Sequence, residues 1–205
     1  MMRWTFIALA LLVFASCARP TPIDNNAVAT VPLRQCLAAL DERQASYAQI
    51  NAFSEGRGCG IRDGVAISHG LIALDETATL TCTTALAVDS FQREVVHPLA
   101  LHYFGQPVVS MELWGSYACR GRTGNAGRLS EHAFGRAIDV AGFRLADGTM
   151  VMVTDWYRST PGGAFLQAVA RGACDHFSVV LTPVSDAAHR DHFHLDTGPW
   201  PLCEV

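Results

Sequence analysis

Two short stretches, Ser130–Val140 and Ala188–Asp196, hold the residues whose types and spacing could do chemistry. The first contains His132 and Asp139, and the second contains His194. Two imidazoles and one carboxylate suit a catalytic zinc site, which uses three protein ligands and leaves a fourth position to water. The alternative interpretation is a pair of structural histidines that are satisfied by hydrogen bonds.

The spacing of these residues sets requirements on the backbone that carries them. His192 and His194 are two residues apart, so a strand would point both side chains to one face. His132 and Asp139 are separated by an odd number of residues, which would put them on opposite faces of one regular strand. Gly135 offers a bend between them. We therefore expect His132 on a loop and Asp139 on the strand that follows.

The sequences of the two stretches, SEHAFGRAIDV and HRDHFHLD, resemble the extensin-like C-terminal domain of bacteria, a resemblance that covers roughly residues 32–205. More distantly they resemble the D-alanyl-D-alanine carboxypeptidase, dipeptidase and murein endopeptidase zinc metallopeptidases. Those enzymes share Ser-x-His-x(6)-Asp, followed by an acidic residue three positions before a second histidine. Carried over by position, the resemblance implies one zinc ion bound by His132, Asp139 and His194, with Asp191 as the general base.

Neighbouring residues are candidates for further roles, and each has an alternative. Asp191 would take a proton from the attacking water, or would only support a neighbouring side chain; Glu131 is the rival base. Arg120 follows a Ser-Tyr-x-x-Arg stretch similar to a motif of the carboxypeptidases, which implies a role in binding transition-state charge or a substrate carboxylate. His192 would donate to the developing oxyanion or be structural, and His189 would support a ligand or be structural.

The N-terminal part of the chain has the pattern of an export signal followed by a linker. Met1–Cys17 has a positive start and an apolar segment too short for a membrane span, which is typical of a signal peptide. Its end, Phe-Ala-Ser-Cys, resembles a lipobox and predicts a lipoprotein leader anchored at Cys17; ordinary cleavage is the alternative. Residues 18–31 would form a linker and residues 32–205 one domain. This predicts a periplasmic protein anchored to the outer membrane.

Six cysteines remain after Cys17, and they predict a domain held together by three disulfides in an oxidising compartment. Fifteen pairings are possible, and closeness in sequence suggests Cys36 with Cys59. The chain contains no CxxC pair, so thiolate zinc ligation is not expected. The six are Cys36, Cys59, Cys82, Cys119, Cys174 and Cys203.

The expected secondary structure indicates an α+β fold, a mainly antiparallel sheet with packed helices. Apolar residues recur at helical spacing over Thr83–Phe104, where Pro98 should kink the helix. We expect Ala137–Phe143 and Asp191–Asp196 to be the strands that carry the site, and Arg122–Arg128 to be a mobile loop before it. Through the resemblance, the fold is expected to be zinc-peptidase-like.

The function expected from these observations is a periplasmic zinc-dependent peptidase that hydrolyses amides in peptidoglycan stems or cross-links. The alternatives are a wall-binding protein that keeps its metal without turnover, and a structural envelope protein. Peptidoglycan peptides and the membrane, through the lipid anchor, are the expected partners. Because the formal net charge is -4 and the sequence has no basic block, we expect no nucleic-acid partner. The sequence does not indicate the oligomeric state.

Overall fold

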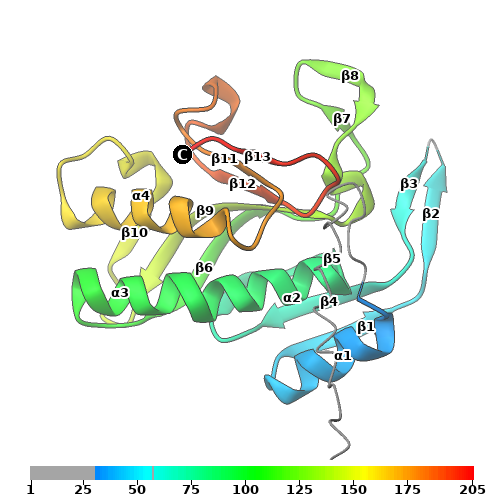
Figure 1. Ribbon diagram of the computed structural model, residues 1–205, viewed down its shortest axis with the longest axis horizontal. Helices are drawn as coiled ribbons and strands as arrows, with labels where there is room; N and C mark the ends of the chain where they lie inside the picture. Colours follow the sequence, from blue (N-terminus) through cyan, green and yellow to red (C-terminus); the bar gives the residue numbers. More distant parts are fainter. Residues whose placement is uncertain (1–30, 57) are drawn as a thin grey trace, which may run out of the picture.

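A computed structural model describes residues 31–56 and 58–205, so the expected leader, its Cys17 anchor and almost all of the linker lie outside the described residues. The described part is built on one large sheet with helices packed on it (Figure 1). The expected α+β class is confirmed. Across the sheet the strands follow the order β1 (Ser46–Ile50), β4 (Gly64–His69), β5 (Ala73–Thr81), β6 (Val108–Gly115), β9 (Ala137–Leu145), β12 (Phe193–Asp196), β11 (Val179–Leu181) and β13 (Leu202–Cys203), with β10 (Met150–Met152) beside β9.

Most neighbouring strands of this sheet run antiparallel, as expected. The exceptions are β5 with β6 and β11 with β13, which are parallel. The first of these parallel pairs is joined by the long helical segment, because parallel neighbours need a long crossover connection. Strand β5 is absent from the elements expected from the sequence.

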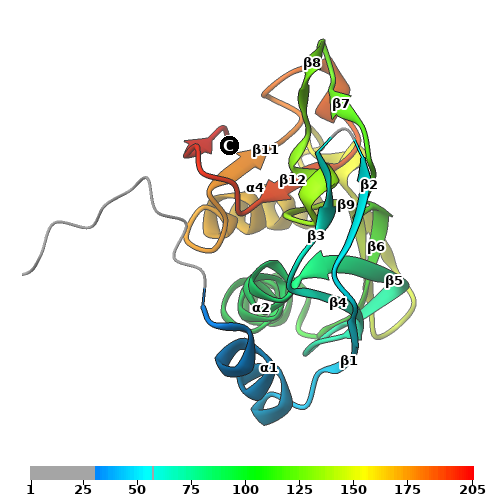
Figure 2. The ribbon, with the colours of Figure 1, turned by 90° about the vertical axis from the view of Figure 1, so that its right-hand side faces the viewer.

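The helices lie together on one face of the sheet (Figure 2). They are α1 (Leu33–Glu42), α2 (Cys82–Phe91), α3 (His97–Phe104) and α4 (Pro161–Ala173). Side-chain oxygens of the preceding threonines cap α2 and α4, and Gly105 ends α3 with a φ of 67°. Within the described residues, no helix is long and apolar enough to cross a membrane.

The long helix expected over Thr83–Phe104 is confirmed, and its irregularity is a π-helical turn over Gln92–Val96. The N–H of His97 bonds to the carbonyl of Gln92, five residues earlier. Pro98 follows at once and has no N–H to continue regular α-helical bonding. The expected disturbance therefore lies just before the proline.

The hydrophobic core lies between the sheet and the helices. On β9 and β12, the paired residues Ile138 with Leu195 and Val140 with Phe193 belong to this core. Side chains alternate along a strand, so the residues between them point to the opposite face of the sheet. That opposite face carries the candidate site.

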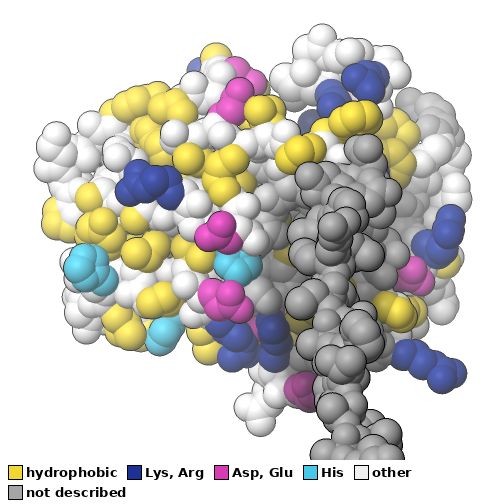
Figure 3. All heavy atoms as spheres, viewed as in Figure 1, with side chains coloured by type: hydrophobic (Ala, Val, Ile, Leu, Met, Phe, Trp, Pro, Cys, Tyr) yellow, Lys and Arg dark blue, Asp and Glu magenta, His cyan; other side chains and the backbone are white. Residues whose placement is uncertain are grey.

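Outside the core, the surface over α3 and α4 shows hydrophobic side chains interspersed with histidines (Figure 3). Leu101 on α3 is 45 % exposed. Scattered apolar residues are ordinary on protein surfaces.

Two hairpins project beside the large sheet (Figure 2): β2 (Phe53–Gly56) with β3 (Cys59–Ile61), and β7 (Gly121–Arg122) with β8 (Asn125–Leu129). The second hairpin replaces the irregular loop expected over Arg122–Arg128, and the mobility of this segment stays a prediction. Gly124 takes a φ of 78° at its turn, which a glycine adopts without steric cost. The polar, glycine-rich composition that suggested a loop is the composition of a tight turn.

Within residues 31–56 and 58–205 three disulfides are present, as expected, but the suggested Cys36–Cys59 pairing is wrong. The structure pairs Cys36 with Cys82, Cys59 with Cys119, and Cys174 with Cys203. Packing of α1 beside α2 brings the first pair together, although 46 residues separate the two cysteines in the chain.

Candidate metal centre

His132 lies on a short 3-10 turn over Glu131–Phe134, immediately before strand β9. Gly135 ends this turn with a φ of 63°, and its peptide nitrogen bonds to the carbonyl of His132. A Cβ atom at this position would lie 2.3 Å from Cδ1 of Ile61. Both the left-handed backbone and the close packing therefore favour glycine, and the expected bend between His132 and Asp139 is confirmed.

Asp139 and His194 face each other across neighbouring strands. They form a register pair of the antiparallel β9–β12 ladder, and Nδ1 of His194 lies 2.9 Å from Oδ1 of Asp139. Nε2 of His132 lies 3.1 Å from Oδ2 of Asp139 and 3.2 Å from Nδ1 of His194. One potential ligand atom from each residue thus falls within 4.8 Å of the others. The three residues predicted as metal ligands are brought together.

Each histidine of this cluster is fixed through its second ring nitrogen. Nδ1 of His132 is bonded to the backbone oxygen of Ser116. Nε2 of His194 lies 3.1 Å from Oδ2 of Asp196, whose Oδ1 accepts the N–H of Gly198. Such outer partners set the tautomer and orientation of metal-binding histidines. Asp196 was not singled out from the sequence, although its position two residues after His194 puts both side chains on one face of the strand.

The cluster is strongly polarised. Burial would raise the pKa of Asp139, but the hydrogen bonds from His132 and His194 outweigh it and hold that pKa well below its usual range. Burial would lower the pKa of His194, but the hydrogen bonds with Asp139 and Asp196 raise it to about 9. The site thus stabilises positive charge between buried carboxylates.

The donor set fits a zinc ion. Two imidazole nitrogens and one carboxylate are typical zinc ligands, and three protein ligands leave a position open. Both histidines present one nitrogen to the cluster while the other is held by an oxygen, as metal-binding histidines usually are. The cluster is nearly buried, with exposed fractions of 1 % for His132 and 9 % for His194.

His192 lies at the edge of the cluster, and Asp191 lies behind it. Oδ1 of Asp191 is 3.0 Å from Nδ1 of His192, while Nε2 of His192 is 3.9 Å from Oδ1 of Asp139. The exposed indole of Trp114 packs at a tilt near the His192 ring, with centroids 5.6 Å apart. Two residues predicted to act in catalysis lie here. His192 lines the cleft, and Asp191 is hydrogen-bonded to the side of the His192 ring that faces away from the cluster.

Glu131, the rival general base, is engaged elsewhere. Its Oε2 accepts from Nε of Arg136 at 2.7 Å, and its Oε1 lies 3.4 Å from Nη2 of Arg122. Glu131 lines the cleft, but both of its carboxylate oxygens are paired with guanidinium groups. The geometry favours the Asp191 and His192 pair over Glu131.

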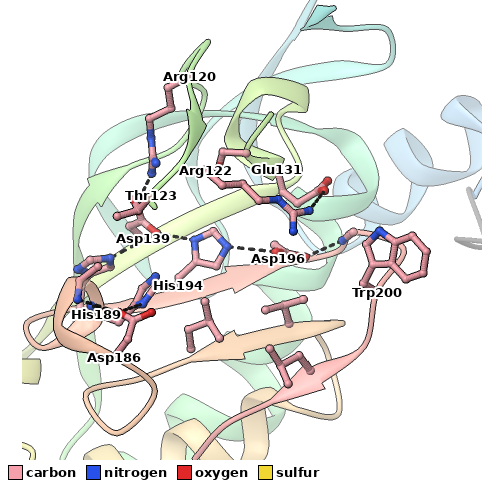
Figure 4. A pocket seen from close by; sticks show the side chains of 17 residues that line it. Arg120, Arg122, Thr123, Glu131, Asp139, Asp186, His189, His194, Asp196 and Trp200 are labelled. Carbon is pink, nitrogen blue, oxygen red and sulfur yellow. Dashed lines mark hydrogen bonds and ion pairs between the residues drawn. The ribbon is translucent and has the colours of Figure 1, made fainter. Parts of the chain in front are cut away.

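An open cleft of about 340 Å³ leads to the cluster (Figure 4). The β7–β8 hairpin and the segment before it supply Arg120, Arg122 and Thr123 to its lining. Arg120 points toward Asp139, with its Nη2 atom 3.8 Å from Oδ2, and Trp200 lies at the far end. Arg120 is 44 % exposed, so its guanidinium is accessible from the cleft.

His189 adds a second carboxylate-supported imidazole to the cleft. Its Nδ1 lies 2.8 Å from Oδ1 of Asp186, and its ring lies near those of His192 and His194. Burial lowers the pKa of His189, which favours a neutral ring. The sequence suggested a supporting role for this residue, and the structure places it on the cleft wall beside the cluster.

Comparison with known proteins supports one assignment. The family model described as extensin-like protein C-terminus matches residues 34–204. A search of curated proteins found no match, and a search of solved structures found none either. The resemblance to zinc peptidases therefore stays a prediction. Because the matched range covers most of the sequence, the chain belongs to the extensin-like protein C-terminus family.

Proposed function

We propose that this protein is a zinc-dependent peptidase of the periplasm that hydrolyses amide bonds in peptidoglycan peptides. The observation that carries the proposal is the convergence of His132, Asp139 and His194 at an open cleft, with both imidazoles oriented by outer oxygens. A purely structural cluster has no need to border open space that is large enough for a ligand.

The chain would hold one zinc ion through His132, Asp139 and His194. When bound, zinc supplies a Lewis acid that polarises a carbonyl and lowers the pKa of water toward neutrality. Asp139 contributes the negative charge of the ligand set, and its low pKa keeps it ionised. Asp196 holds the His194 ring so that Nδ1 faces the other two ligands.

The proton-handling groups are the Asp191 and His192 pair. Asp191 accepts a hydrogen bond from Nδ1 of His192, which leaves Nε2 toward the cleft, where it can accept or return a proton. In this proposal the imidazole of His192 handles the proton and Asp191 orients and polarises it, whereas the sequence led us to expect Asp191 to take the proton from the water itself.

Arg120 is suited to a negative group of the substrate. Its guanidinium lies on the cleft side of Asp139 and is partly exposed. Guanidinium groups bind carboxylates and developing oxyanions in a directed way. Peptidoglycan stems carry both, as free carboxylates and as the amide carbonyls under attack.

The proposed location also has support. Three disulfides in a small domain are typical of an oxidising compartment. The lipid anchor at Cys17 and the outer-membrane location remain part of the proposal.

The test is hydrolysis of purified muropeptides by Asp191→Asn. Asparagine keeps the volume of aspartate but removes its basicity, so turnover should fall by roughly 100-fold while zinc content stays that of the wild type. Asp147→Asn, in the exposed turn between β9 and β10, is the matched control and should keep full turnover. Elemental analysis measures the metal, and mass spectrometry measures the products.

If Asp191→Asn hydrolyses muropeptides at the wild-type rate, the general base must be assigned to another residue. Stoichiometric zinc without turnover in the wild-type protein would favour a wall-binding protein that retains its metal.

A further inference from the structure

The floor of the cleft changes from polar to apolar from one strand to the next. Asp139 on β9 is paired with His194 on β12, and His194 is paired in turn with Leu181 on β11. One strand further, Val179 on β11 is paired with Leu202 on β13. Since these pairs stand opposite each other, the apolar residues share the face that carries the metal ligands.

Four residues make up this apolar floor: Val179, Leu181, Trp200 and Leu202, all of which line the cleft. Trp200 is 59 % exposed and Leu202 is 47 % exposed, while Val179 and Leu181 are partly exposed. Val180, between the two β11 residues, is fully buried in the core on the other face. The floor is therefore a second apolar surface, separate from the core.

The charged groups beside the floor are already paired within the chain. Asp196 is bonded to His194, and Asp186 is bonded to His189. The floor itself carries no ionisable side chain. A charged ligand group would lose hydration there without gaining a partner, whereas a hydrocarbon group would leave water at no such cost.

The floor is held in place before any ligand arrives. Strand β13 pairs with β11, the N–H of Glu204 bonds to the carbonyl of Val180, and a disulfide joins Cys203 to Cys174 at the end of α4. Little ordering is then required on binding, which favours affinity.

We propose that the apolar floor is a binding subsite for the aliphatic side chain of a residue that flanks the amide at the metal cluster. Neighbouring strands lie about 4.8 Å apart, so Leu181 is about one such step from His194. Val179 is about one step, and Leu202 about two, from Asp196, two residues further along β12. An extended peptide advances about 3.4 Å per residue, so the adjoining residue of a bound peptide falls over the floor. The proposal rests on the proposed function for the identity of the amide, but the subsite binds whether or not the amide is cut.

The test uses the zinc-loaded full chain and blocked dipeptides. The parent is N-acetyl-glycyl-glycine amide, and in the other members either glycine is replaced by leucine or glutamate, in the L or D form. Calorimetry at millimolar concentrations measures binding, and mass spectrometry of the same samples measures hydrolysis. At least one leucine peptide should bind about tenfold more tightly than the parent, the scale of a modest hydrophobic contact. Any gain by a glutamate peptide would come from Arg120 on the cleft wall and should not depend on the floor side chains.

The variants locate this preference. The double variant Trp200→Ala with Leu202→Ala should reduce the preference for leucine to less than about threefold. The control Leu101→Ala removes a similarly exposed leucine from α3, away from the cleft. This variant should retain the preference for leucine peptides. Both floor side chains are exposed, so the double variant is expected to fold, and circular dichroism checks this.

Equal binding of leucine and glycine peptides, no binding by any of them, or a preference that survives in the double variant would overturn the subsite. A leucine preference without hydrolysis would uphold the subsite and count against the peptidase. Hydrolysis without a preference for leucine would support the peptidase and overturn the subsite.

Discussion

Removing the carboxylate of Asp196 should weaken zinc binding although this residue lies outside the ligand set. Asp196 is 4 % exposed, and its Oδ2 lies 3.1 Å from Nε2 of His194. A hydrogen bond to a buried charged group contributes about 1.5–3 kcal/mol, which corresponds to roughly 10-fold to 100-fold in affinity. Asp196→Asn keeps an acceptor oxygen, so its loss of zinc affinity should be about 10-fold, the lower limit of this range. Asp196→Ala removes the acceptor and also leaves the N–H of Gly198 without its partner, so its loss of zinc affinity should be about 100-fold, the upper limit.

Competition with a chromophoric zinc chelator measures these affinities. Asp186→Asn is the matched control, because its carboxylate also supports a cleft histidine, His189, which is not a predicted ligand. Asparagine can still cap the turn that follows, so zinc affinity should stay within about twofold of wild type. Wild-type zinc affinity in Asp196→Ala would refute the role of this residue and weaken the assignment of His194 as a ligand.

Further predictions concern pH, the C-terminal disulfide and the proton-handling pair. His194 has a raised pKa of about 9 and must be neutral to bind metal, so zinc titrations should show affinity rising between about pH 7 and pH 9; a flat profile would argue against this ligand. Replacing Cys174 and Cys203 by serine should lower the free energy of unfolding in urea by about 3.6 kcal/mol, from a separation of 29 residues, at unchanged zinc affinity. An unchanged urea midpoint would count against a stabilising bridge. His192→Gln and Asp191→Asn should reduce muropeptide turnover by similar factors, and the double variant little further; additive losses would mean that the two act separately.

The ligand set could be anticipated because the resemblance carries it over by position, although 55 residues separate Asp139 from His194. The bend before Asp139 follows from the local sequence. Gly135 marked the bend that separates His132 from Asp139, and the structure has that bend. The two strands expected to carry Asp139 and His194 are also present and adjacent. Asp196 was missed because an acidic residue at the end of a strand has many possible roles, and only the contact with His194 distinguishes them.

Other features depend on tertiary packing that the sequence pattern does not express. Strand β5 carries Asp75, Glu76 and Thr77 in its middle, so its composition does not suggest a strand inside a sheet. Its parallel pairing with β6 requires the helical crossover to fold back on the sheet. The Cys36–Cys82 bridge likewise depends on how α1 packs against α2, which nearness in sequence does not predict.

Digestion of purified peptidoglycan sacculi tests the central claim most directly. The zinc-loaded protein should release or shorten muropeptides, and each cut should add the mass of one water to the products. The same preparation treated with a chelator and the variant His132→Ala should leave the muropeptide profile unchanged, because each lacks the complete metal centre. An unaltered profile with zinc-loaded wild-type protein, or equal cleavage by the chelated protein, would contradict the account.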